Sequence, residues 1–410
     1  MIFLGKKKYF FHKIMAAFLS CVFLFSLTAC SEEKVMETVT AYGTYGEKIA
    51  LDLARNYPFR SAFSEQEKGA GAYIKKAFEE LGFTVQEQVF SSPDQTGSSK
   101  NYIVRIDGDG FMAPDEKGKY QKKERTVVVG CHYDSFFSEA DKETVTGYLG
   151  VHDNAAGVGA LLTLAKSLQD VKVGYDVVLV AFGAGAVEPL GSQYFFNSLS
   201  AEEKAAVEVM YCIDSIYAGD KLYASSGLTS ILPGMKYEMR RKMYELYDVV
   251  YEFEISSEKV GGFDILYNQS SLLVDLNGDE HPDVFREVSL SQSDYVPFDK
   301  AGIPVVFIES FDYNYAEIEK MKETRNLNLQ EYGGFVRNTE LDSVTILRAV
   351  LPEGRLERRI NTVAFALNKA ILKGAHDAVT TTEYANGQRL EPTVSVTSVT
   401  SVGTKESTLA

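Results

Sequence analysis

The chain has 410 residues, of which 45% are hydrophobic and 24% are charged, so it can bury one large core or two smaller ones. Its formal net charge is -15 and it offers no basic stripe for phosphate groups, which argues against a nucleic-acid partner. The acidic balance says little about the substrate, because a solvated acidic surface is its ordinary explanation.

The first 30 residues have the features of a targeting signal. Four lysines precede an apolar stretch over 15–27, which is shorter than the roughly 20 residues that a membrane span needs. The sequence Leu27-Thr-Ala-Cys30 then resembles the bacterial lipobox, which implies that Cys30 is lipidated and becomes the mature N-terminus. We therefore expect a signal peptide over 1–30 and a tether over 31–39, with the protein anchored by lipid to the cell membrane and facing outside the cytoplasm.

The segment after the tether is predicted to contain two helices, two strands and a charged loop. The helices are predicted over roughly 36–56 and 64–81, the strands over 84–90 and 102–107, and the loop over 108–125. The second helix begins with a capping-box spacing, in which Ser64 is followed three residues later by a glutamate.

A short β-branched run, Thr126-Val-Val-Val129, is typical of a buried parallel strand. His132 and Asp134 follow at its carboxyl end, which is the edge of an open α/β sheet where ligands bind. Asp153 then begins a predicted helix with apolar residues at helical spacing. Nitrogen and oxygen ligands in one small space suit a metal such as zinc. A loop histidine with an N-capping aspartate is the alternative, so the residues alone leave both interpretations open.

Beyond this helix the patterns alternate between strand and helix, as in a mostly parallel sheet. Strands are predicted over 176–182, 207–214 and 303–308, and helices over 190–199 and 355–372. The less regular segment 216–290, with one helix near 234–247, is predicted to be an insertion near the site. We therefore predict one α/β domain over 40–376 with helices on both faces of the sheet, and a disordered Ser/Thr-rich tail over 377–410.

Two cysteines remain outside the predicted signal peptide and its lipid attachment site. Cys131 and Cys212 both lie at the ends of predicted buried strands. A free thiol in such a place behaves as a small apolar side chain, and two cysteines do not make a disulfide framework.

Six short motifs, in order and at matching spacing, resemble the co-catalytic zinc aminopeptidases, metallopeptidase family twenty-eight. The motifs are His132-Tyr-Asp134, His152-Asp153-Asn154-Ala-Ala-Gly157, Ala181-Phe-Gly-Ala184, Leu190-Gly-Ser192, Ile213-Asp214 and Ser293-Asp294-Tyr295-Val-Pro-Phe298. The resemblance covers roughly residues 40–372 and implies the zinc-exopeptidase fold. In that family a histidine and a later aspartate hold one zinc, and another aspartate bridges both zincs. A glutamate and a last histidine hold the second zinc, and a neighbouring glutamate is the general base.

Carried over residue by residue, the resemblance implies one full set of metal ligands. His132 matches the first histidine, Asp153 the bridging aspartate and Asp214 the carboxylate that completes the first metal. Asp134 matches the residue that orients this histidine. His152, beside the bridging aspartate, is a possible extra ligand. The implied cofactor is zinc, one ion at most.

The other half of the family's site is missing. Gly185 and Ala186 stand where the family has two adjacent glutamates, the base and a ligand, and Tyr295 stands where it has the last histidine. Glycine and alanine side chains can neither bind zinc nor move a proton, and a phenol of pKa near 10 is a poor substitute for imidazole. Glu188 and His281 are candidates for compensation, but a solvated side chain is the simpler expectation for both.

Three functions are compatible with these features. The favoured one is a lipid-anchored aminopeptidase homologue that has lost peptidase chemistry and binds a peptide or protein, as the similar ectodomain of the transferrin receptor allows. The second is an active one-metal exopeptidase that removes N-terminal residues with an unrecognised base. Glutaminyl cyclases, related in fold, also use one zinc, but on the other half of the site. The third, a solute-binding lipoprotein of a transporter, would need two α/β lobes, and the sequence indicates one.

Overall fold

The computed structural model describes residues 37–137, 149–227, 237–275, 279–281, 283–315 and 317–386. The fold described below is that of the compact unit Thr38–Ala410. The predicted signal peptide, Cys30, most of the tether and the tail beyond residue 386 lie outside the described residues. Within the part that is described, no helix combines the length and the apolar character that crossing a membrane requires.

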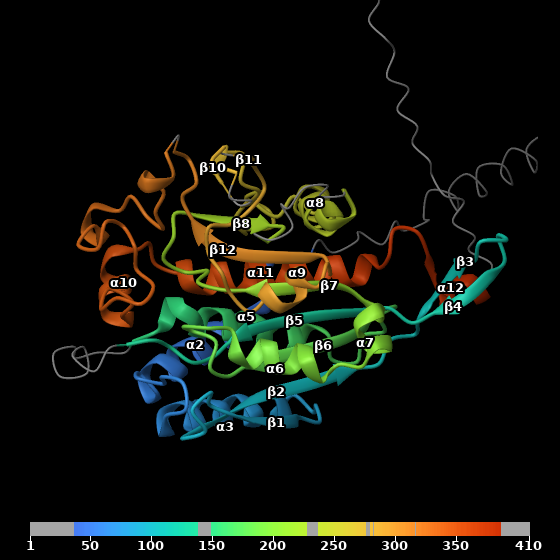
Figure 1. The fold of residues 1–410 in the computed structure, drawn as a ribbon, viewed down its shortest axis with the longest axis horizontal. Helices are drawn as coiled ribbons and strands as arrows, with labels where there is room; N and C mark the ends of the chain where they lie inside the picture. Colours follow the sequence, from blue (N-terminus) through green and yellow to red (C-terminus); the bar gives the residue numbers. More distant parts are fainter. Residues whose placement is uncertain are drawn as a thin grey trace, which may run out of the picture. The chain divides into compact units, whose positions relative to one another are not determined.

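A mixed eight-stranded sheet runs through the centre of this unit, in the order β1-β2-β6-β5-β7-β12-β8-β9 (Figure 1). Its strands are β1 (Gln86–Ser91), β2 (Ser98–Ile106), β5 (Thr126–His132), β6 (Asp176–Phe182), β7 (Val207–Ile213), β8 (Lys221–Ser225), β9 (Ile265–Leu266) and β12 (Val305–Phe311). The central strands β6, β5, β7 and β12 are parallel, whereas β1, β2 and β8 pair antiparallel with their inner neighbours. The predicted mostly parallel sheet is therefore confirmed.

Helices cover both faces of the sheet, as predicted (Figure 1). The longer helices are α2 (Tyr45–Asn56), α3 (Glu65–Glu80), α5 (Ala156–Ser167), α8 (Tyr237–Glu252) and α11 (Arg355–Lys373), and the shorter ones are α6 (Leu190–Ser198), α7 (Ala201–Ala206), α9 (Val296–Lys300) and α10 (Val344–Val350). The connections within the described residues include the short 3-10 helices η1 (Val39–Tyr42), η4 (Ile318–Lys320) and η5 (Leu327–Leu329). The last long helix, predicted over 355–372, is confirmed.

The alternation of side chains along the strands divides the core between the two faces. In β5, Val127 and Val129 pack in the cluster that contains residues of α2, α3, α5 and α11, whereas Val128 packs in the cluster with α6 and α9. Successive side chains of a strand point to opposite faces, and each buried valine contributes about 1.5–3 kcal/mol through removal of apolar surface from water. This packing on both faces holds the carboxyl edge of the strands in place.

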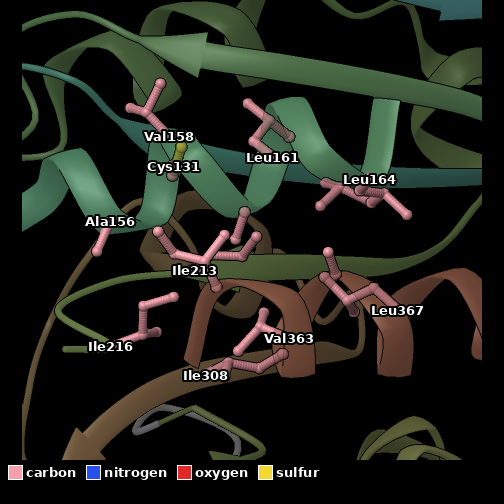
Figure 2. Close-up of a cluster of buried hydrophobic side chains, with 14 of the residues drawn as sticks. Cys131, Ala156, Val158, Leu161, Leu164, Ile213, Ile216, Ile308, Val363 and Leu367 are labelled. Atoms are coloured by element: carbon pink, nitrogen blue, oxygen red, sulfur yellow. The ribbon is translucent and has the colours of Figure 1, made fainter. Parts of the chain in front are cut away.

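The thiol of Cys131 lies in the first of these clusters, which also contains Val158 and Leu161 of α5 (Figure 2). Cys131 and Cys212 are both buried free cysteines, as predicted. Burial raises the pKa of each thiol well above its ordinary value, so neither is a reactive thiolate.

The segment 108–125, predicted as a loop, instead contains the hairpin β3 (Phe111–Pro114) and β4 (Tyr120–Lys123). A third strand, β13 (Val379–Thr380), pairs with β3 and leads into α12 (Thr381–Ala385). The first part of the predicted disordered tail is therefore ordered. Its partner strand lies more than 260 residues away in the chain, which local composition does not reveal.

The segment 216–290 contributes to the central sheet as well as covering it. Strands β8 and β9 extend the sheet beyond β12, and α8, predicted over 234–247, packs against both of them. The short hairpin of β10 (Leu272–Val274) and β11 (Asp283–Phe285) forms a separate two-stranded sheet. The strands β8 and β9 are short, which explains why no strand was predicted here.

Candidate metal centre

Two of the predicted ligands come from neighbouring parallel strands. His132 is the last residue of β5, and Asp214 follows directly after β7, the strand that pairs with β5. The backbone N–H of Asp214 donates to the carbonyl of Ile308 on β12, 2.9 Å away, so the chain stays in register with the sheet at this point. Both side chains therefore lie at the carboxyl edge of the sheet, where the sequence predicted them.

Asp153 lies in η2 (Val151–Ala155), a single π-helical turn that precedes α5. Asp153 and Asn154 have non-helical backbone angles and α5 begins only at Ala156, so the prediction that Asp153 begins the helix is wrong. The carboxylate of Asp342 explains this difference, because it accepts the backbone N–H groups of His152 and Asp153 at 2.7 and 2.8 Å. The backbone N–H groups of His152 and Asp153 therefore find their acceptor in a distant side chain instead of in a helix.

The three predicted ligands converge. One ligand atom from each of His132, Asp153 and Asp214 lies within 4.8 Å of the other two, and all three residues are buried. His132 Nε2 is 3.2 Å from Asp153 Oδ1 and 3.6 Å from Asp214 Oδ1. Among the residues whose placement is described, this is the one group of three or more such side chains that could hold a metal ion.

Asp134 lies on the other side of the imidazole. His132 Nδ1 is 3.1 Å from the backbone carbonyl of Asp134 and 3.4 Å from its carboxylate. An N–H at Nδ1 that donates to these oxygens leaves Nε2 free to bind a metal, the usual arrangement of a ligating histidine. The Asp134 carboxylate is itself held by the backbone N–H groups of Gly185 and Ala186.

The carboxylates set the charge state of the imidazole. Burial alone would lower the pKa of His132, but hydrogen bonds with Asp134, Asp153 and Asp214 outweigh it and hold this pKa well above its ordinary value. Burial would likewise raise the pKa of Asp214, yet the nearby charges of Arg337 and His132 hold it well below its ordinary range. Without a metal, a proton on His132 therefore neutralises part of the site.

Arg337 and two further carboxylates border this group, and the sequence analysis missed all three. Arg337 Nη1 is 3.9 Å from Asp214 Oδ2, and its other nitrogens contact Glu309 and Glu323. Glu309 directly follows the predicted strand 303–308, so its place at a strand end was a usable signal. Arg337 and Glu323 come from a segment with little regular structure, where no pattern pointed to them.

A second arginine, Arg60, ties together the two loops that carry the ligands. Its fully buried guanidinium donates to the carbonyls of Tyr133, Leu149 and Gly150 at 2.5, 3.2 and 2.6 Å. Tyr133 adjoins His132, and Gly150 precedes the turn of Asp153. Arg60 therefore fixes the distance between the first and second ligand segments.

The family's base and second-metal ligands correspond to Gly185, Ala186 and Tyr295 of this chain. These residues lie in two different environments. Gly185 is beside His132, because a Cβ built on Gly185 would meet His132 Cβ at 2.4 Å. Tyr295 is fully buried in the apolar cluster with α6 and α9. Its ring packs against that of Phe307 in a tilted arrangement, and its hydroxyl donates to the carbonyl of Ser291 at 2.7 Å. The phenol is thus a core side chain, not a ligand.

The candidates for compensation do not join the group. His152 Nδ1 accepts the backbone N–H groups of Tyr217 and Ala218, each at 3.2 Å, and its Nε2 is 3.5 Å from Glu323. Both ring nitrogens are directed elsewhere, which corrects the hypothesis that His152 adds a ligand. Glu188 and His281 are exposed, as the simpler expectation had it.

Asp294 is an unusual buried carboxylate next to this site. Neither of its oxygens makes a hydrogen bond of normal geometry within the described part of the chain, although the backbone amide of His132 is near. Burial raises the pKa of Asp294 to about 7. The charge of His132 acts to lower this pKa, whereas the charges of Asp214 and Asp134 act to raise it. The Oδ1 atom of Asp294 would be 3.0 Å from a Cβ at position 185.

The donor set fits a zinc ion. One imidazole nitrogen and two carboxylate oxygens are the ligand types and the number that zinc takes in sites that keep one position open. A divalent cation would also balance the excess of buried acidic groups and take the place of the proton on His132. The observed separations between ligand atoms require small shifts at most, because two ligands of one zinc lie about 3–4 Å apart.

Solved structures that share this fold are zinc exopeptidases and glutaminyl cyclases. The chain belongs to Peptidase family M28, whose sequence profile matches residues 115–326, including all three members of the ligand group. This confirms the family resemblance found in the motifs.

Individual relatives are distant. The alkaline phosphatase isozyme conversion protein of Escherichia coli K12 is 23% identical over 328 residues, which cover 78% of this chain and 87% of that protein. BSAP, a zinc aminopeptidase from Bacillus subtilis, has a TM-score of 0.52 at 15% identity, with 80% of this chain and 95% of BSAP covered. Macrostomum lignano glutaminyl cyclase has a TM-score of 0.55 at 14% identity, covering 84% and 94%. At such identities the structural likeness shows the fold alone.

Proposed function

We propose that this protein is an M28 peptidase homologue that binds one zinc ion through His132, Asp153 and Asp214 and has little or no peptidase activity. One observation carries the proposal: the single ligand group is complete, while Gly185, Ala186 and Tyr295 supply neither a base nor ligands for a second ion. A zinc ion there would polarise a carbonyl group or a bound water. The chain's own residues orient His132 and exclude solvent, but none stands at the family's base position. The protein would then serve as a binding module for a peptide or protein ligand.

Zinc analysis of the purified protein tests this proposal. We expect at most one tightly held equivalent per chain, and its loss in His132→Ala. His376→Ala is the matched control, because that histidine is half exposed and lies outside the ligand group. Two equivalents in the wild-type protein, or an unchanged content in His132→Ala, would contradict the proposal.

Metal binding should release a proton. The pKa of His132 is raised by its carboxylate neighbours, whereas a metal binds only the neutral imidazole. As the pH rises toward that raised pKa, the competing proton leaves, so the affinity for cobalt or zinc should increase about tenfold per pH unit. Calorimetric titration at pH 7 in buffers of different ionisation enthalpy should report about one proton released per ion. An affinity that does not change with pH would refute this linkage.

A second candidate function, a one-metal exopeptidase, has one observation in its favour. The Asp294 carboxylate lies next to position 185, is buried, and has no hydrogen-bond partner of normal geometry within the described residues. Such a group could accept a proton where the family's glutamate is missing. Because Asp294 is 0% exposed, a substrate or water would have to reach its carboxylate from the metal side.

We also propose that the protein is a lipoprotein held at the outer side of the cell membrane through Cys30. The lipobox resemblance at residues 27–30 supports this. A diacylated cysteine would make the protein partition into the detergent phase of Triton X-114, because two acyl chains give stable anchoring. Cys30→Ala should remain unprocessed or be released, whereas Cys21→Ala, inside the predicted signal peptide, should behave as the wild type. A Cys30→Ala protein that loses residues 1–29 as the wild type does and still partitions into the detergent phase would exclude the lipid anchor.

A further inference from the structure

Arg337 is a partly buried cation next to the proposed metal ligands. Its guanidinium lies among three carboxylates: Nε is 2.7 Å from Glu323 Oε1, Nη2 is 3.3 Å from Glu309 Oε2 and Nη1 is 3.9 Å from Asp214 Oδ2. Only 18% of the side chain is exposed. The positive charge is therefore poorly screened by water and acts on the ligand group at short range.

The guanidinium is held in this position from two sides. Glu323, which pairs with Nε, also accepts the backbone N–H groups of Val336 and Arg337 at 2.5 and 3.0 Å. Glu309, which pairs with Nη2, accepts the hydroxyls of Ser291 and Tyr313 at 2.8 and 2.6 Å. Because both partner carboxylates are fixed by hydrogen bonds, the charge of Arg337 cannot swing away when a metal ion binds.

This geometry determines whether Arg337 strengthens or weakens the binding of a metal ion. Asp153 and Asp214 give the ligand group two negative charges, which one divalent ion neutralises. Arg337 adds a further positive charge at 3.9 Å from one of those carboxylates. The interaction of Arg337 with Asp214 competes with metal binding, and after one ion is bound the guanidinium repels any second ion that approaches the same edge.

We propose that Arg337 is a built-in counter-ion that weakens divalent metal binding at His132, Asp153 and Asp214 and limits this edge to a single ion. The inference rests on the proposed one-metal function, since it concerns the affinity and the number of ions at that site. Two possible roles of Arg337 predict opposite effects on metal affinity. A counter-ion opposes metal binding, whereas a residue that merely positions Asp214 would support it.

Zinc or cobalt titration of the full chain in detergent, with Arg337→Met, tests the counter-ion. We expect the dissociation constant to fall at least about tenfold, since removal of a unit charge this close to a ligand removes more than 1.4 kcal/mol of repulsion at a partly buried site. Arg337→Lys keeps the charge and should bind metal as the wild type does. Arg348→Met is the matched control, because that arginine pairs with Glu47 at an exposed position.

Loss of Arg337 also leaves buried carboxylates without their partner, and a variant that does not fold would be uninformative. The variant Arg337→Gln removes the cation but keeps a side-chain amide that can donate to the neighbouring carboxylates, and it should show the same tighter binding. Equal or weaker metal binding by whichever folded variant lacks the charge overturns the inference. The wild-type stoichiometry decides the proposed function separately: two ions in the wild type would refute that function, whereas one ion with no change between variants refutes the counter-ion alone.

Discussion

The wild-type protein should release nitroaniline from aminoacyl-nitroanilides at least about 10²–10⁴-fold more slowly than an active two-zinc aminopeptidase assayed in parallel. This range is what a general base typically contributes, and position 185, where the family has its base, is a glycine. The absence of a second ion removes further stabilisation of the transition state. Base, ligand glutamate and last histidine act on one water in the family, so the loss of any one of them should already remove most of the rate, and the other losses should add little to it.

The assay should cover a panel of aminoacyl and dipeptide substrates with added zinc, cobalt or manganese. Two variants separate the possible sources of any turnover: Asp153→Ala lacks a proposed metal ligand, and Asp294→Asn lacks the neighbouring buried carboxylate. Chelator-sensitive hydrolysis that disappears in both variants would show that the one-metal exopeptidase is the correct function. Hydrolysis that persists in Asp153→Ala would instead point to a contaminating peptidase.

The sequence predicted the parts of the fold and site that depend on local patterns. Strand β5 was identified from its β-branched residues, and the parallel order of the sheet from the alternation of strands and helices. The convergence of His132 with Asp214 was implied by the family resemblance, and it agrees with the rule that ligands bind at the carboxyl ends of parallel strands. These features need no knowledge of contacts between distant segments.

Three features that the sequence did not reveal depend on such distant contacts. The turn around Asp153 departs from a helix because Asp342, 189 residues further along the chain, accepts its backbone N–H. Arg337 reaches the ligand group from a segment without helical or strand periodicity. The pairing of β13 with β3 likewise joins segments that lie far apart in the chain. In each case the interacting residues are unremarkable in their own local sequence.

The remaining strong prediction concerns Gly185, which should not accept the glutamate that the family carries there. A Cβ on Gly185 would lie 2.4 Å from the Cβ of His132 and 3.0 Å from Asp294 Oδ1, and the backbone N–H of Gly185 already donates to Asp134 at 2.7 Å. Even Gly185→Ala must therefore push the loop or the imidazole, and should lower the free energy of unfolding by about 1–3 kcal/mol, as overpacking does.

Because the displaced residue, His132, is a proposed metal ligand, Gly185→Ala and Gly185→Glu should also weaken zinc binding. The triple variant Gly185→Glu, Ala186→Glu and Tyr295→His should give no active enzyme. Ala186→Glu is the matched control, since Ala186 already has a Cβ and is only partly buried. It should change the urea-unfolding midpoint and the zinc affinity far less than Gly185→Glu does. A Gly185→Glu protein as stable as the wild type, with unchanged zinc affinity, would show that the loop can open. The missing base would then be a simple substitution that left the rest of the centre intact, instead of one built into the packing between this loop and β5.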